Sequence, residues 1–189
     1  LLVSPYFVPG SEGVAWLREL AARGVKVRVL TNSYLANDVG PVHAGYSSYR
    51  EDLLRAGVEI QELKPGAELK SEARRGGSSG SSLHAKTYMV DARRLYVGSF
   101  NLDPRSVRLN TEMGIVLESE TLCASVRERL LARLPDIAYA VERDPDTGAL
   151  AWTTREDGRE VRYESEPGMG LVDSFRQWLL RILPAEEQL

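Results

Sequence analysis

The stretch VKVRVLTNSYLANDVGPVHAGYSSYREDLLRAGVEIQEL, residues 25–63, carries the clearest evidence of the fold class. Its beginning, residues 25–32, alternates apolar and polar side chains as a β-strand does. Residues 44–57 then follow a helical pattern that stops at Gly57, and residues 58–63 form a second strand-like run. Strands joined by a helix are typical of a parallel sheet covered by helices.

The segments on either side extend this alternation. Residues 1–7 are strand-like, and residues 11–24 form an amphipathic helical pattern. Three short strand-like runs follow further along the chain, and the last leads into a helical pattern over residues 120–134. We therefore predict an α/β fold built on a mainly parallel sheet.

The sequence pattern changes after Pro135. Three short strand-like segments, separated by DPDTG and EDG, are typical of a small β-meander, and residues 171–183 form a closing helical pattern. We expect one domain over residues 1–134 and a C-terminal extension, a β-meander plus an amphipathic helix, over residues 135–189.

The composition is that of an ordinary globular protein, with 43% hydrophobic and 27% charged residues. A net charge of -3 disfavours nucleic acid as a partner, because neutralising phosphates requires clustered Lys and Arg. The one cysteine, Cys123, has no internal partner for a disulfide, which fits a reducing compartment. The chain opens within a strand-like run without an initiator Met, so we expect it to be a piece of a longer protein.

Polar residues are concentrated around a predicted hairpin near the middle of the chain. Residues two apart in a strand share a face, so His84 lies beside Lys86, and Ser99 beside Asn101. A turn of two or four residues would pair His84 with Asn101 and Lys86 with Ser99, whereas an odd turn would shift the register by one. With an even turn, an imidazole, an ammonium, a hydroxyl and an amide form one compact patch.

Such a patch suits substitution at phosphorus. A lysine and an amide stabilise the non-bridging oxygens, and a neutral histidine attacks phosphorus and holds the group covalently. A diester also needs a second, protonated acid for the leaving alkoxide. The two histidines and one cysteine show no metal-ligand spacing, and no glycine-rich loop opens a helix, so we expect neither a metal nor a cofactor.

These residues fit the spacing HxKx4Dx6GSxN, and with it the chain resembles the phospholipase D superfamily. The matching positions are His84, Lys86, Asp91, Gly98, Ser99 and Asn101. Flanking stretches such as SPYFVPG and NTEMG resemble the C-terminal half of bacterial cardiolipin synthases, most closely the C-type enzymes. The resemblance implies a phospholipase D-like mixed sheet flanked by helices, with the catalytic domain at residues 1–134.

The resemblance also implies roles for single residues. His84 matches the histidine that becomes phosphohistidine or acts as the general acid. Glu112 matches the carboxylate that accepts the other ring N–H of that histidine. The positions that hold the phosphate are Lys86 and Asn101, supported by Ser99 and Gly98.

Two further residues are open to more than one interpretation. Asp91 belongs to the motif, but its place at the hairpin turn favours a structural role, in which its carboxylate bonds backbone N–H groups. His43 recurs in the resemblance as a candidate substrate contact, although a histidine near a helix start is more often a cap or a packing group.

The family builds its active site from two such motifs, and this chain contains one. An upstream half of the same chain, or a homodimer partner, is expected to supply the other. The resemblance implies a bacterial cardiolipin synthase, a phosphatidyltransferase that acts on phospholipids through a phosphohistidine and is cytoplasmic, peripheral on the inner face of the plasma membrane. The alternatives are a phospholipase D-type phosphodiesterase that hydrolyses lipid or nucleic acid, and a non-catalytic half that binds lipid or a partner.

The closing helix has one apolar side. The apolar residues at helical spacing are Leu171, Phe175, Trp178, Leu179, Ile182 and Leu183. Either this side docks on the rest of the domain, or the helix lies in the headgroup region of a membrane, where Trp, Phe and flanking Arg are favourable.

Overall fold

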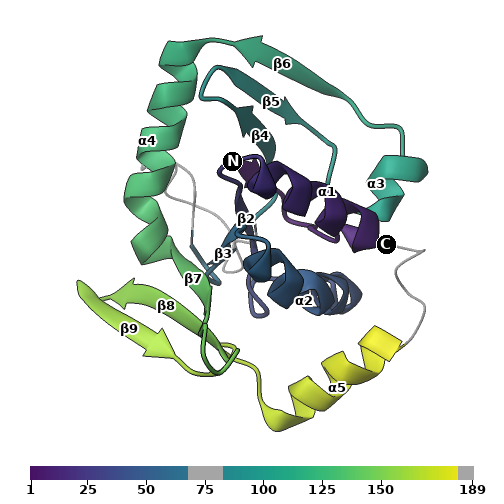
Figure 1. The fold of residues 1–189 in the computed structure, drawn as a ribbon, viewed down its shortest axis with the longest axis vertical. Coiled ribbons are helices and arrows are strands. Elements are labelled where there is room, and N and C mark those ends of the chain that lie inside the picture. The colour runs from purple at the N-terminus through teal and green to yellow at the C-terminus, as the bar shows by residue number, and fades with distance from the viewer. Residues whose placement is uncertain (68–82, 183–189) are drawn as a thin grey trace.

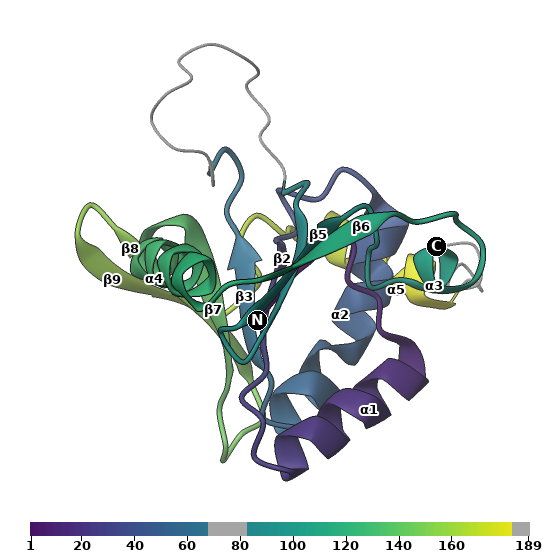
Figure 2. The same ribbon diagram turned by 90° about the horizontal axis from the view of Figure 1, so that it is seen from above.

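The computed structural model describes residues 1–67 and 83–182, and Figures 1 and 2 show its fold from two directions. Within these residues nine strands form one sheet, in the order β6-β5-β4-β1-β2-β3-β7-β8-β9. The strands are β1 (Leu2–Val3), β2 (Arg28–Asn32), β3 (Glu59–Leu63), β4 (Lys86–Val90), β5 (Arg94–Gly98), β6 (Gly114–Glu118), β7 (Ala138–Arg143), β8 (Leu150–Glu156) and β9 (Arg159–Tyr163). The helices are α1 (Gly10–Ala22), α2 (Gly40–Arg55), α3 (Pro104–Arg108), α4 (Glu120–Ile137) and α5 (Leu171–Ile182).

The centre of the sheet is the parallel unit that residues 25–63 predict. β1 pairs in parallel with β2, and β2 with β3. The pairings further out are antiparallel, beginning with β1 to β4 on one side and β3 to β7 on the other. The α/β class is confirmed, but the expected mainly parallel sheet is wrong, because only two of the eight strand pairings in the described residues are parallel. The sheet is mixed, as the family resemblance implied.

Helices cover the central strands on both faces, with α1 and α2 on one side and α4 on the other (Figure 2). Neighbouring residues of β2 therefore enter two different cores. Val29 packs in the cluster that contains Leu17 of α1 and Leu53 of α2. Leu30 packs in a second cluster with Leu134 of α4. Each such fully buried side chain contributes about 1.5–3 kcal/mol, so burial on both faces holds β2 at the centre of the sheet.

The C-terminal strands extend this sheet and do not form a separate layer. α4 continues through Pro135 to its end at Ile137 and passes directly into β7, which pairs antiparallel with β3. The predicted meander exists as β7, β8 and β9, and it covers an edge of β3 that would otherwise be unpaired. The domain boundary expected after residue 134 falls within α4. The division of the chain into two domains stays a prediction.

The helix α5 lies at the periphery of the molecule beside α2 (Figure 1). It is 12 residues long. No helix in the part of the chain that the structure describes is both long enough and apolar enough to cross a bilayer.

The hairpin of β4 and β5 has an odd turn. Lys86 pairs with Gly98, and three residues separate the two strands. The predicted pairings of His84 with Asn101 and of Lys86 with Ser99 are therefore wrong. The polar residues of the motif are brought together by side-chain hydrogen bonds and not by direct strand pairing.

The backbone of the turn explains the shifted register. Asp91 and Ala92 have positive φ angles of 51° and 50°. The Arg93 N–H donates a hydrogen bond to the Val90 carbonyl over 3.0 Å. This is a tight turn of the primed kind, whose twist matches that of the strands, and Arg93 is inserted after it as one extra residue.

Candidate functional site

All the motif residues except Asp91 lie at the end of the sheet where the central parallel strands finish. Because β4 runs antiparallel to β1, Val3 pairs with Thr87, and Lys86 begins β4 level with Ser4. His84 precedes β4, and its side chain is exposed. Ligands of open α/β sheets bind outside the carboxyl ends of the parallel strands, so this is a favourable position for a site.

Lys86 is buried and oriented by the backbone of the motif. Its Nζ donates a hydrogen bond to the carbonyl oxygen of His84 over 3.0 Å. Burial lowers the pKa of Lys86, while the charges of Glu112, Asp103 and Asp38 act to raise it. The ammonium is therefore fixed directly beside the backbone of the histidine, with carboxylates around it that favour its charged form.

Ser99 and Glu112 form a second polar pair in the site. Ser99 Oγ donates to Glu112 Oε2 over 2.5 Å and accepts from the Met113 N–H over 3.0 Å. Asn110 Nδ2 donates to the other carboxylate oxygen, Oε1, over 3.2 Å. The Ser99 hydrogen bond is the main cause that lowers the pKa of Glu112, and the charge of Lys86 adds to it. The structure thus brings Lys86, Ser99 and Glu112 into one cluster without direct strand pairing between them.

We expect Ser99→Ala to raise the pKa of Glu112 toward its ordinary value, because the change removes the hydroxyl that donates to the carboxylate. An NMR titration of the Glu112 carboxyl in the 189-residue chain measures the shift. Ser99→Thr keeps a hydroxyl and is the matched control, in which the pKa stays low. A pKa that does not change in Ser99→Ala would contradict the pairing.

Gly98 permits the close approach on which this cluster depends. A Cβ at this position would overlap the Tyr96 hydroxyl and the Met113 carbonyl. With no side chain there, the Ser99 N–H reaches the Met113 carbonyl over 2.8 Å. A glycine beside Ser99 is thus a steric requirement for joining β5 to β6 at the site.

Asn101 is held by its backbone next to the cluster. Its N–H donates to Ser106 Oγ over 3.3 Å, and the following residue, Leu102, donates to Ser4 Oγ over 3.2 Å. The side-chain Oδ1 of Asn101 is buried and has no hydrogen-bond partner among residues 1–67 and 83–182. Because buried polar atoms are nearly always paired, this amide is a candidate for contact with a group from outside those residues.

The ring of His84 makes no hydrogen bond within the described part of the chain. Glu112, which the resemblance assigns to the other ring N–H, bonds Ser99 and Asn110 instead. That assignment, like the other catalytic roles, stays a prediction. The His84 side chain is exposed, whereas the side chains of Lys86 and Ser99 are held by hydrogen bonds.

Three residues near the site were not singled out from the sequence. Asp38 accepts a hydrogen bond from the Tyr6 hydroxyl over 3.2 Å, and Asp103 is buried and accepts from the Ser106 N–H over 2.6 Å at the start of α3. Both carboxylates act on Lys86. Asp103 could have been recognised from the sequence, because an Asp followed by Pro104 is typical of the start of a helix. Asp38 and Tyr6 could not, since they meet only through the packing of the sheet.

Asp91 lies apart from this cluster. It sits in the turn at the far end of β4 from Lys86, is exposed, and has a left-handed backbone conformation. Asp tolerates that conformation better than most residues do. The Asp91 carboxylate makes no hydrogen bond to a backbone N–H group in the described residues, so the bonding expected for it is not observed, and its structural role stays a prediction.

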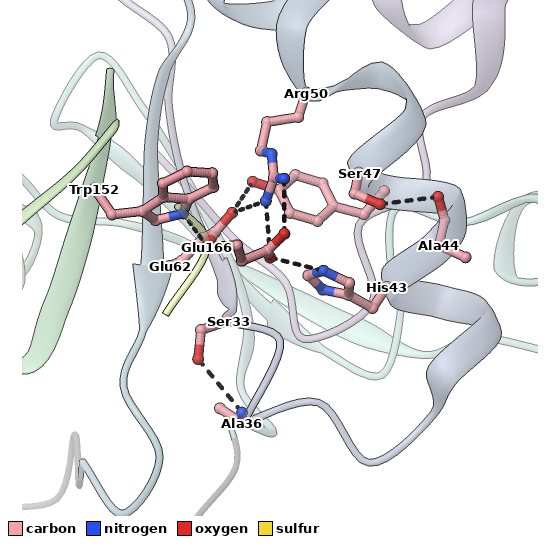
Figure 3. Close-up of polar contacts among 10 residues, drawn as sticks. Ser33, Ala36, His43, Ala44, Ser47, Arg50, Glu62, Trp152 and Glu166 are labelled. Carbon is pink, nitrogen blue, oxygen red and sulfur yellow. Dashed lines mark hydrogen bonds and ion pairs between the residues drawn. The ribbon is translucent and has the colours of Figure 1, made fainter. Parts of the chain in front are cut away.

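His43 is fully buried, on the inner side of α2 (Figure 3). Its Nε2 lies 2.8 Å from Glu166 Oε1, and its Nδ1 has no hydrogen-bond partner within the described residues. It also lines a cavity of about 260 Å³ with Arg176 and Gln177 of α5. His43 therefore contacts Glu166 and makes no hydrogen bond with Lys86, Ser99 or Glu112 in the described residues, and a substrate contact for it stays a prediction.

His43 belongs to a buried network of charged groups centred on Arg50 (Figure 3). The two terminal nitrogens of Arg50 bind the two oxygens of Glu166, each over 2.9 Å, and one of them also contacts Glu62 over 2.9 Å. The Tyr46 hydroxyl and the Trp152 indole N–H donate to Glu62 over 2.7 and 2.9 Å. The network ties α2 to β3, β8 and the segment before α5. Sequence reasoning missed it because Arg50 and Glu166 are 116 positions apart.

Burial by itself raises the pKa of Glu166, but the contact with His43 and the charge of Arg50 outweigh it and lower the pKa to about 2. Glu166 is therefore ionised at neutral pH and paired inside the protein. In the part of the chain that the structure describes, this network included, no group of three His, Cys, Asp or Glu side chains is arranged to hold a metal ion.

Sequence comparison relates the chain to proteins of lipid synthesis. The family described as "Cardiolipin synthase, PLD-like domain" matches residues 1–133. Cardiolipin synthase C of Escherichia coli (strain K12) is 45% identical over 188 residues, which are 98% of this chain and 40% of that protein. Cardiolipin synthase A of Pseudomonas aeruginosa is 36% identical over 168 residues, which are 89% of this chain and 28% of that protein. The chain thus spans less than half the length of these relatives.

Two solved structures share the fold. Nuc from Salmonella typhimurium, a phospholipase D family member, aligns with a TM-score of 0.55 and 17% identity over 75% of this chain and 80% of its own. Phosphatidylserine synthase from Haemophilus influenzae aligns with a TM-score of 0.53 and 18% identity over 74% of this chain and 33% of its own. At these identities the likeness concerns the fold alone.

Proposed function

Since the chain belongs to the family of phospholipase D-like cardiolipin synthase domains, we propose that it is one catalytic half of a bacterial cardiolipin synthase. In this proposal residues 1–134 carry the catalytic half, and residues 135–189 are an extension that contains β7, β8, β9 and α5. The reaction is transfer of a phosphatidyl group from one phospholipid to a hydroxyl group of another.

The first step forms a phosphohistidine. A nitrogen of the His84 ring attacks the phosphorus of the donor lipid, and the bond to the departing headgroup oxygen breaks. That oxygen takes a proton from the acid of the opposing motif. In the second step the hydroxyl of the acceptor lipid gives up its proton to that same group and attacks phosphorus, which releases His84. In the other order of roles, His84 is the acid and the opposing histidine is the nucleophile.

The arrangement around Lys86 is the observation that carries this proposal. Its ammonium is anchored to the carbonyl of His84, so positive charge lies next to the phosphorus that the histidine would attack. There Lys86 and the Asn101 amide stabilise the non-bridging oxygens as charge shifts onto them. The ionised Glu112, held by the Ser99 hydroxyl, adds a charge interaction with Lys86.

The opposing motif comes from an upstream half of the full-length protein or from a second copy of this chain. The exposure of His84 supports this, because a histidine that faces an opposing half must be uncovered in a single half. The protein works at the inner face of the plasma membrane as a peripheral enzyme, where phospholipid substrates are available to a cytoplasmic active site.

A lipid-transfer assay on the full-length protein tests the function. Vesicles that contain phosphatidylglycerol are incubated with the protein, and the products are separated by mass. Cardiolipin formation is expected. Release of phosphatidic acid without cardiolipin would identify a phosphodiesterase that uses water as acceptor, and the absence of both products in folded protein would favour a non-catalytic half.

The 189-residue chain alone is expected to show negligible turnover while it is monomeric, because it contains one motif and lacks the opposing acid or nucleophile. Light scattering establishes the oligomeric state in the same buffer as the lipid-transfer assay. The full-length protein is the positive control. A chain that is monomeric and still turns over lipid at about 1 s⁻¹ or faster would overturn the half-site proposal.

A further inference from the structure

The helix α5 is docked through its polar side. Gln177 is buried against the rest of the protein, and Leu180 lies over Gly40 at the start of α2. The Asp173 carboxylate accepts from the Gly170 N–H over 3.2 Å, and burial together with this carboxylate raises the pKa of Tyr34. These residues of α5, 173, 177 and 180, share one face of a helix with 3.6 residues per turn.

The opposite side of α5 is apolar and uncovered. The exposed side chains on this side are Val172 (82% exposed), Phe175 (64%), Trp178 (54%) and Leu179 (47%). Phe175 and Trp178 stack on each other with their ring centroids 5.8 Å apart. Of the two alternatives for the apolar side, docking on the domain therefore does not hold for these four residues. Four large apolar side chains in one exposed stripe indicate a surface that binds something else.

The position and charge of α5 favour a lipid bilayer as that partner. Arg176 is exposed at one margin of the apolar stripe, whereas the acidic Asp173 lies on the docked side. Trp and Phe beside an Arg suit the headgroup region of an anionic membrane, where buried apolar area and charge attraction both contribute.

The contacts of α5 also connect it to the candidate site. Its Arg176 and Gln177 line a cavity with Tyr34 and Asn37, which belong to the loop between β2 and α2. That same loop carries Asp38, whose charge acts on Lys86. A membrane contact at α5 would therefore lie at the same end of the sheet as the phosphate cluster.

We propose that the exposed apolar stripe of α5, formed by Val172, Phe175, Trp178 and Leu179, inserts into the headgroup region of an anionic bilayer. The choice of a bilayer over a protein partner rests on the proposed lipid substrate. The binding itself requires no catalysis, so it is measured separately from activity.

The test is flotation of the full-length protein with vesicles that contain phosphatidylglycerol. The double variant Phe175→Ser and Trp178→Ser is expected to bind about a hundredfold more weakly, because two large side chains no longer leave water. Arg176→Gln is expected to weaken binding to anionic vesicles about fivefold and to leave binding to neutral vesicles unchanged. Because these side chains are exposed, the melting temperatures of the variants should match that of the unmodified protein.

The matched control replaces two exposed apolar residues far from α5 in the sequence. Ile115 and Val116 of β6 are 59% and 63% exposed, and Ile115→Ser with Val116→Ser should bind vesicles as the unmodified protein does. Equal binding by the Phe175 and Trp178 double variant would overturn the inference. The inference would also be overturned if the unmodified protein is a dimer, the double variant is a monomer, and both bind vesicles equally. A second copy would then be the partner of the stripe. Loss of vesicle binding by that variant supports the inference even if the transfer assay finds no cardiolipin.

Discussion

His84→Ala is expected to abolish phosphatidyl transfer in the full-length protein, with a loss of more than about a thousandfold. In the proposed mechanism this ring either attacks phosphorus or transfers the proton, and no neighbouring side chain of the cluster can replace it. Lys86, Ser99 and Glu112 supply an ammonium, a hydroxyl and a carboxylate, and none of these can take both roles of an imidazole, which attacks phosphorus and carries a proton near neutral pH. The rate of cardiolipin formation from phosphatidylglycerol vesicles measures the loss.

The structure makes this substitution informative, because it separates catalysis from folding. The His84 side chain is exposed, and the contact that orients Lys86 uses the backbone carbonyl of residue 84, which alanine retains. The melting temperature should therefore stay within a few degrees of the unmodified protein.

Asp91→Asn is the matched control for His84→Ala. Asp91 belongs to the same motif, yet it lies in the turn at the other end of β4, and asparagine adopts the left-handed backbone conformation readily. Its transfer rate should stay within a few-fold of the unmodified rate. A folded His84→Ala protein that still makes cardiolipin would remove His84 from the mechanism.

Arg50→Met is expected to lower the free energy of unfolding by about 3–5 kcal/mol, the largest stability effect we predict. The change leaves Glu62 and Glu166 inside the protein without their shared cation. Both carboxylates are buried, and Arg50 contacts each of them over 2.9 Å. Urea unfolding of the 189-residue chain, followed by circular dichroism, measures the difference.

Arg55→Met on the same helix is the control for that substitution. Arg55 pairs with Glu51 over 2.6 Å, but both side chains are largely exposed, and such pairs contribute about 0.3–0.5 kcal/mol. If Arg50→Met and Arg55→Met cost the same, the buried network would have no special part in stability.

The pKa of Glu166 also predicts how stability depends on pH. Its folded pKa of about 2 lies below the ordinary value of 4.5, so the native state favours the ionised form. This contribution is complete above about pH 4.5 and is lost as the pH falls toward 2. Glu166→Gln should make the free energy of unfolding less dependent on pH in this window, and an unchanged dependence would contradict the pairing with Arg50 and His43.

The order of the elements and the identity of the motif could be predicted from the sequence alone. The strand pattern of residues 25–32, the helical pattern of residues 44–57 and the stop at Gly57 are local properties, and the structure places β2 and α2 there. The spacing from His84 to Asn101 likewise identifies the family without any knowledge of contacts. Periodicity and motif spacing depend on neighbours in the chain, so they can be recognised from one sequence.

Tertiary structure decided the register of the hairpin and the assembly of the site. Lys86 pairs with Gly98 because Asp91 and Ala92 take positive φ angles. An Asn-Gly pair would have predicted such a turn from the sequence, whereas an Asp-Ala pair does not. Ser99 then reaches Glu112 across β5 and β6, through a close approach that Gly98 permits.

The same holds for the contacts between distant segments. β7 pairs with β3, and Arg50 meets Glu166 across 116 positions, because packing brings these segments together. The amphipathic pattern of α5 was readable, but the side that docks was not. A helical pattern shows that the two faces of a helix differ in polarity, but it does not show which face is buried. The neighbouring surface decides that. Here α2 and the β2–α2 loop contact the face of α5 that carries Gln177 and Leu180.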